Sequence, residues 1–162
     1  MISVVYDSPV GKLTLISDGA ALARCEFENP RYAYDSAPAG KDKILDQARR
    51  ELDLYFKGKL KDFDVPVAPR GTEFQRACWK ALQGIPYGAT RSYGQQAVAI
   101  GKPKAVRAVG LANGRNPISI IIPCHRVIGA NGGLTGYGGG MPRKQFLLDL
   151  EQGAGVLNLK AS

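Results

Sequence analysis

The sequence predicts an α/β fold, in which a small N-terminal antiparallel three-stranded sheet and one helix precede a mostly helical domain with a helix-turn-helix. Short β-prone runs near the N-terminus are separated by turn residues, which is typical of hairpins. Further along the chain, apolar residues recur at helical spacing, and two of these segments begin with capping boxes. Two short helices joined by a glycine-containing turn have the outline of a helix-turn-helix.

The start of the chain contains the runs that we expect to form the sheet. Three runs are rich in β-branched and apolar residues: 2–6, 13–17 and 20–27. The dipeptide Asp18-Gly19 separates the second run from the third, and Asp-Gly between β-prone runs is a strong hairpin signal. Cys25 alternates with Phe27 in the third run, so its side chain is expected to fill the core.

One helix and a linker complete the first domain. Apolar residues recur at helical spacing over residues 44–56, and Gly58 follows as a stop signal. Residues 60–71 contain two prolines, which indicates a linker. We therefore expect an N-terminal α/β domain with its linker at residues 1–70 and a C-terminal domain at residues 71–162.

The second domain opens with a capping box formed by Thr72 and Gln75. The helix that follows is predicted to bury one apolar face, made of Phe74, Ala77, Cys78, Ala81 and Leu82. Cys78 on this face is expected to be chemically inert, because a buried thiol behaves as a small apolar side chain.

A second capping box, Ser92 with Gln95, begins a short helix that Gly101 ends. Pro103 suits the first position of a further helix, which is predicted to end at Gly114. Together these two segments are the predicted helix-turn-helix.

Basic residues gather at the start of the second helix of this pair. Lys102, Lys104 and Arg107 lie where such motifs meet DNA, and the chain has a net charge of +8. This charge favours a polyanionic partner, nucleic acid before membrane, because no apolar run is long enough to span or anchor in a bilayer. The alternative is an ordinary helical corner with solvated lysines.

The sharpest chemical signal is the stretch at 120–129, IIIPCHRVIG. Its apolar, β-branched start predicts a buried strand that ends at Pro123, so that Cys124 and His125 follow at the end of a rigid element. His125 is the only histidine, and a thiol needs a neighbouring base because it is mostly protonated near neutral pH. Adjacent residues of a strand point to opposite faces, so a bridging water or a bend after Pro123 is needed to couple the two groups.

Two features near the C-terminus remain open from pattern alone. Four glycines surround Tyr137, which either lets the backbone approach a ligand closely or makes a surface loop. Pro142 begins the last predicted helix, whose apolar residues are Phe146, Leu147 and Leu150. Glu151 near its end is unfavourable for the helix dipole, which suggests a specific partner; a solvated glutamate is the alternative.

The three cysteines predict free thiols in a reducing compartment. Their number is odd, they are widely spaced, and the N-terminus lacks the basic and apolar regions of a secretory signal. No Cys-x-x-Cys pair exists and there is one histidine, so we expect no metal and no other cofactor. We expect the protein to be cytoplasmic.

The motif Pro123-Cys124-His125-Arg126-Val127 makes the second domain resemble the O6-alkylguanine-DNA alkyltransferases. Asn116-Pro117 before it and a Gly-Tyr-Gly loop and Leu-Asp-Leu-Glu run after it extend the resemblance from residue 74 to residue 151. The resemblance implies a small α/β N-terminal domain and a mostly helical C-terminal domain with a winged helix-turn-helix. Some relatives hold zinc in the first domain with cysteines and histidines; this chain has only Cys25 there.

The resemblance also implies a set of catalytic roles. Cys124 would be the nucleophile and permanent alkyl acceptor, and His125 would be its base through a bridging water. Glu151 would orient and stabilise the imidazole, Asn116 would brace the turn that holds the cysteine segment, and Tyr93 would donate its phenol proton toward the departing guanine.

The same resemblance implies how DNA is held. Arg107 would enter the duplex as a finger and fill the space left by the flipped base. The other implied DNA contacts are Tyr93, Lys104, Ser92 and Gly110, and the implied walls of the base pocket are Tyr137, Gly138 and Val127.

The implied function is direct-reversal DNA repair by a methylated-DNA–protein-cysteine methyltransferase. It would transfer an alkyl group irreversibly from O6 of guanine, or less readily from O4 of thymine, and each molecule would act once. The partner would be double-stranded DNA that contains O6-alkylguanine, bound by a monomer that could assemble cooperatively on DNA. Two alternatives remain: a helix-turn-helix regulator without chemistry, and a hydrolase that uses Cys124 and His125.

Overall fold

The computed structural model describes residues 1–133, 137 and 139–153, which form two compact units. The first unit contains Met1–Arg70 and Pro117–Ile121. The second contains Gly71–Asn116 and the described residues from Ile122 onward. Residues 117–121, which the sequence analysis assigned to the second domain, therefore have their contacts in the first unit. Among the described residues, no helix combines the length and hydrophobicity needed to cross a bilayer.

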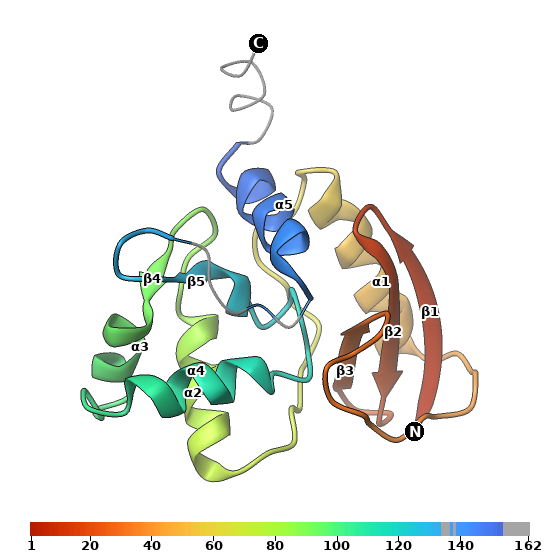
Figure 1. Cartoon of the computed structure of the whole chain (residues 1–162). Coiled ribbons are helices and arrows are strands. Elements are labelled where there is room, and N and C mark those ends of the chain that lie inside the picture. Colours follow the sequence, from red (N-terminus) through yellow and green to blue (C-terminus); the bar gives the residue numbers. More distant parts are fainter. Residues whose placement is uncertain (134–136, 138, 154–162) are drawn as a thin grey trace. The chain divides into compact units, whose positions relative to one another are not determined.

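The first unit is built on an antiparallel sheet of three strands in the order β1-β2-β3, as predicted (Figure 1). The strands are β1 (Ile2–Ser8), β2 (Gly11–Ser17) and β3 (Leu22–Phe27). The predicted Asp18-Gly19 turn is present: Gly19 has a φ of 95°, and the Asp18 carboxylate accepts two backbone N–H bonds of 2.8 Å. Glycine fits this turn because residues that carry a side chain rarely adopt a positive φ.

The helix α1 (Lys43–Phe56) packs against all three strands (Figure 1). Asp42 caps its N-terminus by accepting a hydrogen bond of 2.8 Å from the Leu45 N–H. Gly58, with a φ of 73°, lies just beyond its end, as the sequence predicted. The apolar side chains that α1 buries are Leu45, Ala48, Leu52 and Tyr55.

The second unit begins with α2 (Glu73–Gln83), whose predicted capping box between Thr72 and Gln75 is present. Its predicted buried face is only partly correct, because Ala77 is exposed and Trp79 is buried. The indole Nε1–H of Trp79 donates to the Ala112 carbonyl at 2.8 Å, which satisfies the one polar atom of this large side chain. The buried face of α2 is therefore centred on Cys78, Trp79 and Leu82.

The helix-turn-helix consists of α3 (Tyr93–Ala99) and α4 (Val106–Gly114). The second predicted capping box, Ser92 with Gln95, is present at the start of α3. The expected start of α4 at Pro103 is wrong: Ala105 is its N-cap residue. A backbone bond from Ala105 N–H to the Lys102 carbonyl makes Pro103 part of a tight turn, for which its fixed φ is equally suited.

The two helices of this motif are joined by a buried pair of side-chain amides. The Nδ2 of Asn113 donates to the Oε1 of Gln96 at 2.7 Å, and the Nε2 of Gln96 donates to the Oδ1 of Asn113 at 2.9 Å. Gln96 Nε2 also donates to the Cys78 carbonyl on α2 at 3.1 Å. Both side chains are buried, so this network fixes the packing of all three helices.

The predicted buried strand at residues 120–122 is wrong, although all three isoleucines are buried. Ile120 has a φ of 72°, and the Ile121 N–H donates to the Ser119 carbonyl, which together define a γ-turn. Pro123, with φ −84° and ψ 67°, forms a second such turn in which the Cys124 N–H donates to the Ile122 carbonyl. The three isoleucines are apolar because they are buried, but the backbone that buries them follows two turns and is not a strand.

The remaining elements follow in the second unit. The 3₁₀ helix η1 (Cys124–Arg126) leads into β5 (Val127–Ile128), which pairs in parallel with β4 (Arg91–Ser92). The last helix, α5 (Met141–Glu151), has Pro142 in its first turn as predicted. Of its apolar residues, Leu147 is fully buried, whereas Phe146 is 40% exposed. The side chains that α5 buries are Lys144, Leu147, Leu148 and Glu151.

We expect the substitution Asn113→Ala to lower the free energy of unfolding by about 2–3 kcal/mol, because it leaves the buried Gln96 amide without its reciprocal bonds. Urea denaturation of the full chain measures this. Leu111→Ala is the matched control on the same helix, since Leu111 is 64% exposed, and it should change the stability by less than about 0.5 kcal/mol. Equal stability of the two variants would contradict a structural role for the amide pair.

Candidate functional site

The sequence Cys124-His125-Arg126 occupies η1 rather than the end of a strand. The Arg126 N–H donates to the Pro123 carbonyl at 3.0 Å, and the Val127 N–H donates to the Cys124 carbonyl. Neighbouring residues in a 3₁₀ turn lie about a third of a turn apart, not on opposite faces as in a strand. The bend after Pro123 that coupling of Cys124 and His125 requires is therefore present.

Cys124 is the one cysteine whose side chain is partly exposed within the described structure; Cys25 and Cys78 are buried. Burial raises the pKa of both buried thiols, which keeps them protonated and poor nucleophiles. None of the three cysteines is in a disulfide within the described part of the chain. The accessible sulfur next to the histidine is therefore the chemically competent one.

His125 is completely buried and tied to Glu151. Its Nε2 lies 2.6 Å from the Oε2 of Glu151, which is 5% exposed and lies at the end of α5. The other ring nitrogen, Nδ1, is buried and has no hydrogen-bond partner among the described residues. An ionised carboxylate can only accept, so it assigns the proton to Nε2 and leaves the lone pair on Nδ1.

Arg126 binds both oxygens of the same carboxylate, a contact that the sequence analysis did not predict. Its Nε donates to Glu151 Oε1 at 2.7 Å and its Nη2 donates to Glu151 Oε2 at 3.0 Å, which is a bidentate pair. Its Nη1 donates to the Ile85 carbonyl at 2.6 Å, and the guanidinium carbon lies 5.8 Å from the centre of the Tyr87 ring. Twenty-five residues separate Arg126 from Glu151, so no local pattern could have revealed the pair.

The electrostatics of this network favour a neutral imidazole beside an ionised carboxylate. Burial alone would raise the pKa of Glu151, but the hydrogen bonds and charges of His125 and Arg126 outweigh it and lower the pKa to about 2. Burial lowers the pKa of His125 below its ordinary value, and the bond with Glu151 opposes this shift without cancelling it. Near neutral pH, the arrangement thus presents a base that can still accept a proton.

Asn116 supports the turn that precedes Cys124. Its side chain is 7% exposed, and its Nδ2 donates to the Ile122 carbonyl at 2.8 Å. That carbonyl is also the acceptor of the Cys124 N–H, so one oxygen is held by two donors. The bond fixes the path of the backbone immediately before the cysteine.

The residues expected to contact DNA lie together on the helix-turn-helix. A Cβ placed on Gly110 of α4 would lie 3.8 Å from two ring atoms of Tyr93, so the Tyr93 ring rests against this glycine. The Ser92 hydroxyl accepts from the Gln95 N–H at 3.0 Å and thus caps α3. Lys104 and Arg107 are exposed in the turn and at the start of α4.

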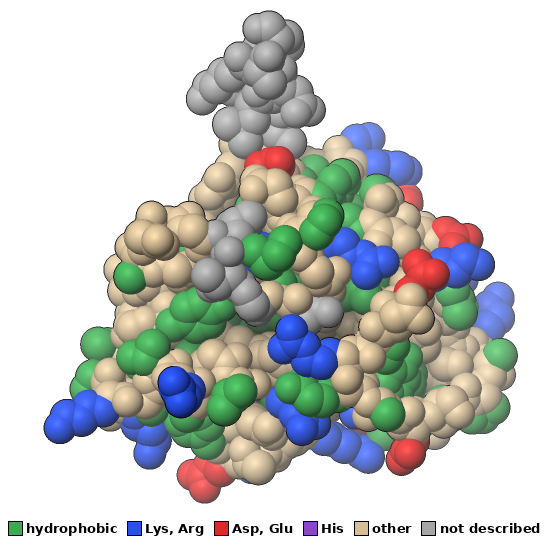
Figure 2. Space-filling view, in the orientation of Figure 1, with side chains coloured by type: hydrophobic (Ala, Val, Ile, Leu, Met, Phe, Trp, Pro, Cys, Tyr) green, Lys and Arg blue, Asp and Glu red, His purple; other side chains and the backbone are tan. Residues whose placement is uncertain are grey.

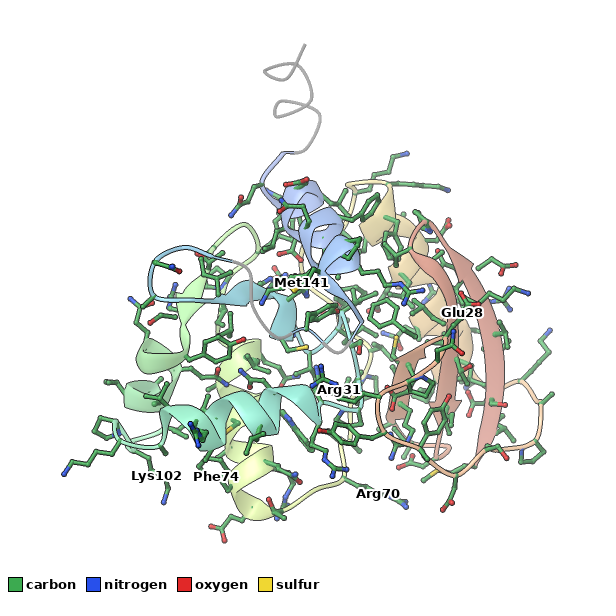
Figure 3. All side chains as sticks on the ribbon, viewed as in Figure 1. Glu28, Arg31, Arg70, Phe74, Lys102 and Met141 are labelled. Carbon is green, nitrogen blue, oxygen red and sulfur yellow. The ribbon has the colours of Figure 1, made fainter. Side chains whose placement is uncertain are left out.

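Basic side chains project over the turn that joins α3 and α4, at the lower left of Figure 2. Lys102, labelled in Figure 3, extends from this turn away from the helices. The pairing of β4 with β5 places the start of α3 beside the strand that follows Cys124. The helix-turn-helix is therefore joined by strand pairing to the segment that carries Cys124.

The expected pocket residues are only partly described. Tyr137 is 6% exposed, and its carbonyl accepts from the Gly140 N–H at 3.0 Å. Val127 is buried in β5. Gly138 lies outside the described residues.

In the part of the chain that the structure describes, no group of three or more His, Cys, Asp or Glu side chains could hold a metal ion.

A partly exposed cysteine next to a buried histidine, in a unit that carries a helix-turn-helix, is the arrangement expected of a DNA-binding protein that uses a cysteine as a nucleophile.

Comparison with known proteins identifies the family. Residues 1–69 match the ribonuclease-like domain of 6-O-methylguanine DNA methyltransferase, and residues 73–153 match its DNA-binding domain. The methylated-DNA–protein-cysteine methyltransferase of Methanosarcina acetivorans is 50% identical over 93% of this chain and 98% of its own. That of Mycobacterium bovis is 53% identical over 90% and 89% of the two chains.

Solved structures agree with these relatives. The crystal structure of Mycobacterium tuberculosis OGT in complex with DNA has a TM-score of 0.88 and 50% identity, and the match covers 94% of each chain. An O6-methylguanine DNA methyltransferase from Methanococcus jannaschii has a TM-score of 0.67 and 28% identity over 92% of this chain and 93% of its own. The protein belongs to the 6-O-methylguanine DNA methyltransferase family.

We expect Glu151→Gln to lower the free energy of unfolding at pH 7 by about 3–5 kcal/mol, because it leaves the Arg126 charge buried without its carboxylate. The folded-state pKa of Glu151 lies below the unfolded value, so its stabilisation is complete above the unfolded value and is lost as the pH falls toward about 2. The lowered pKa of His125 acts in the same direction, since the unfolded chain binds that proton first on acidification.

Urea denaturation at pH 7 and pH 3 measures both effects. The difference between wild type and Glu151→Gln should shrink to about half or less at pH 3. Asp149→Asn on the same helix is the control, because the Asp149 carboxylate only accepts from the neighbouring Gln145 in an exposed position. A difference that stays constant between the two pH values would contradict the proposed ionisation of Glu151.

Proposed function

We propose that this protein repairs alkylated DNA directly, by moving the alkyl group from O6 of a flipped-out guanine to the Sγ of Cys124. One observation carries the proposal: the partly exposed Cys124 adjoins a buried histidine whose Nε2 is engaged by Glu151 and whose Nδ1 is left to accept a proton. The DNA-binding fold and the relatives that are methylated-DNA–protein-cysteine methyltransferases support the same function.

The reaction begins with removal of the Cys124 proton. The proton passes through a bridging water to Nδ1 of His125, and the thiolate becomes the nucleophile. Glu151 stabilises the imidazolium that forms, and Arg126 helps to keep Glu151 ionised. Asn116 holds the turn before Cys124, so the sulfur keeps its position as its charge changes.

Alkyl transfer is an in-line substitution at a saturated carbon. The sulfur forms a bond to the alkyl carbon while the bond from that carbon to O6 breaks, and its electron pair remains on the guanine. Tyr93 donates its phenol proton toward the guanine and so neutralises the developing charge. The product is a thioether on Cys124, which no group in this site can cleave by these steps, so each molecule acts once.

DNA is held by the helix-turn-helix. Extrusion of a base costs a few kcal/mol of unstacking, which Arg107 offsets by filling the space in the duplex. Lys104 and the surrounding positive charge contact phosphates, with Ser92 and Gly110 at the interface. The extruded base lies against Tyr137 and Val127, in a pocket that accepts O4-alkylthymine less readily.

The partner is thus double-stranded DNA that contains O6-alkylguanine. The net charge of +8 supports a partner of this kind, because it favours binding to a polyanion of any sequence. We expect a protein that is a monomer in solution, can assemble cooperatively on DNA and acts in the cytoplasm.

Incubation with a duplex that contains O6-methylguanine should add one methyl group to Cys124, which intact-protein and peptide mass spectrometry detect. Cys124→Ala should abolish the transfer and retain affinity for DNA, since the sulfur is the acceptor and contributes little to binding of the DNA phosphates. Cys78→Ala, at a buried thiol, is the control and should still be methylated. An unmodified wild-type protein that binds the duplex would identify a regulator without chemistry, and more product than protein would identify a turning-over enzyme.

Arg107→Ala should slow repair of the duplex by about tenfold while leaving the reaction with free O6-alkylguanine unchanged, because the arginine acts on base extrusion and not on the sulfur. Single-turnover rates at saturating substrate measure this. Lys102→Ala, at an exposed position of the adjoining turn, should weaken binding in a salt-dependent way without changing that rate. Equal slowing with both substrates would show that Arg107 does not act as a finger.

A further inference from the structure

A large apolar side chain on the helix-turn-helix has no role in the mechanism described so far. Leu111, on α4, is 64% exposed, whereas the residues on either side of Gly110 and Leu111, Val109 and Ala112, are buried. One exposed leucine is ordinary in a soluble protein. However, three of the six large apolar side chains that are exposed in the described part of the chain lie between residues 98 and 111, which indicates a contact surface. These three are Val98, Val106 and Leu111.

Leu111 lies beside the residues that are proposed to extrude the base. Arg107, Gly110 and Leu111 are related by steps of three and four residues, so they share one face of α4. The Tyr93 ring rests against Gly110, since a Cβ placed there would lie 3.8 Å from two of its ring atoms. Leu111 therefore borders the part of α4 where Arg107 and Tyr93 are expected to meet the DNA.

The charge of this domain indicates which partner covers Leu111. Residues 71–162 contain eleven lysines and arginines and three acidic residues, whereas residues 1–70 contain eleven of each kind. No aspartate or glutamate occurs between Glu73 and Asp149, a range that includes the whole helix-turn-helix. A basic surface with an exposed leucine fits a polyanion that has apolar parts of its own. The sugar edges between the phosphates of a DNA duplex are such parts.

A leucine can distinguish nucleic acids by the chemistry of the sugar. Deoxyribose has only C–H bonds at C2′, whereas ribose has a hydroxyl group there, which is the group that lets proteins tell RNA from DNA. The leucine side chain has no polar atom, so a hydroxyl group pressed against it loses its water and gains no hydrogen-bond partner. A C–H edge in the same place loses no hydrogen bond, and its burial is favourable.

We propose that Leu111 is a specificity-determining residue that contacts the sugar edges of the bound duplex and selects deoxyribose over ribose. The inference rests on the proposed binding of DNA by α4 and not on alkyl transfer. The lysines of the turn contact phosphates, which DNA and RNA share, so their charge supplies affinity without this selection. Leu111 adds discrimination by penalising the wrong sugar.

The test compares two hybrid duplexes that differ only at the 2′ position of one strand. Each pairs the same DNA strand with a complementary strand, which is RNA in one duplex and 2′-fluoro-RNA in the other. Both complementary strands favour A-like geometry, so the comparison separates the hydroxyl group from the shape of the duplex. Fluorescence anisotropy of the full chain at one salt concentration measures both dissociation constants and needs no alkylated base. Wild type should bind the 2′-fluoro hybrid about tenfold more tightly than the RNA hybrid.

The variant Leu111→Asn keeps a side chain of similar size and supplies a donor and an acceptor for the hydroxyl group. It should reduce the preference for the 2′-fluoro hybrid to about twofold or less. Leu111→Ala, which removes most of the apolar contact, should give an intermediate ratio and decides the question if Leu111→Asn does not fold. Val5→Asn is the matched control, because Val5 is 56% exposed on β1 of the first unit, and it should keep the wild-type ratio.

The proposal is overturned by a wild-type ratio near one, which would show that the hydroxyl group is not sensed. It is also overturned if Leu111→Asn weakens both hybrids equally, because Leu111 would then supply affinity alone. A wild-type dimer that Leu111→Asn dissociates would identify a second copy of the chain as the partner of this face. The expected ratios in a protein that does not methylate Cys124 would support the role of Leu111 and refute the repair function alone, whereas a protein that binds no duplex would refute both.

Discussion

The carboxylate of Glu151 is the group on which the rest of the site depends. It accepts from Nε2 of His125 on one side and from the guanidinium of Arg126 on the other, with all three side chains buried. A carboxylate at the C-terminal end of a helix is opposed by the helix dipole, and a buried one is opposed by desolvation. His125 and Arg126 together overcome both costs, because their hydrogen bonds and charges lower the pKa of the Glu151 carboxyl and keep it ionised.

An ionised Glu151 determines the chemistry of the histidine. Because the carboxylate can only accept a hydrogen bond, Nε2 holds the proton and Nδ1 holds the lone pair. In this tautomer the imidazole can act as a base, as the proposed mechanism requires. The surrounding loop reinforces this arrangement: Arg126 also donates to the Ile85 carbonyl, and its guanidinium lies over the ring of Tyr87.

Backbone geometry delivers the sulfur to this network. Two successive γ-turns precede the cysteine, and the first requires a positive φ at Ile120, which is costly for a β-branched residue. Burial of the isoleucines and the bond from Asn116 to the Ile122 carbonyl hold the path in place. The result is a 3₁₀ turn in which a partly exposed thiol and a buried imidazole are neighbours, a geometry that a strand cannot provide.

The sequence by itself determined the features that depend on local chemistry. The three strands, the Asp18-Gly19 turn, both capping boxes and the glycine-joined helices follow from turn, capping and periodicity preferences that act over a few residues. The pairing of the only histidine with a cysteine was visible for the same reason.

Only the tertiary structure decided the partners of buried polar groups. The sequence left the partner of Glu151 undecided and predicted no contacts for Arg126 and Lys144. Polar contacts between residues far apart in the chain leave no periodic pattern in the sequence. The isoleucine run failed as a strand for a related reason: apolarity specifies burial, whereas the path of a buried segment is set by the hydrogen bonds that its surroundings offer.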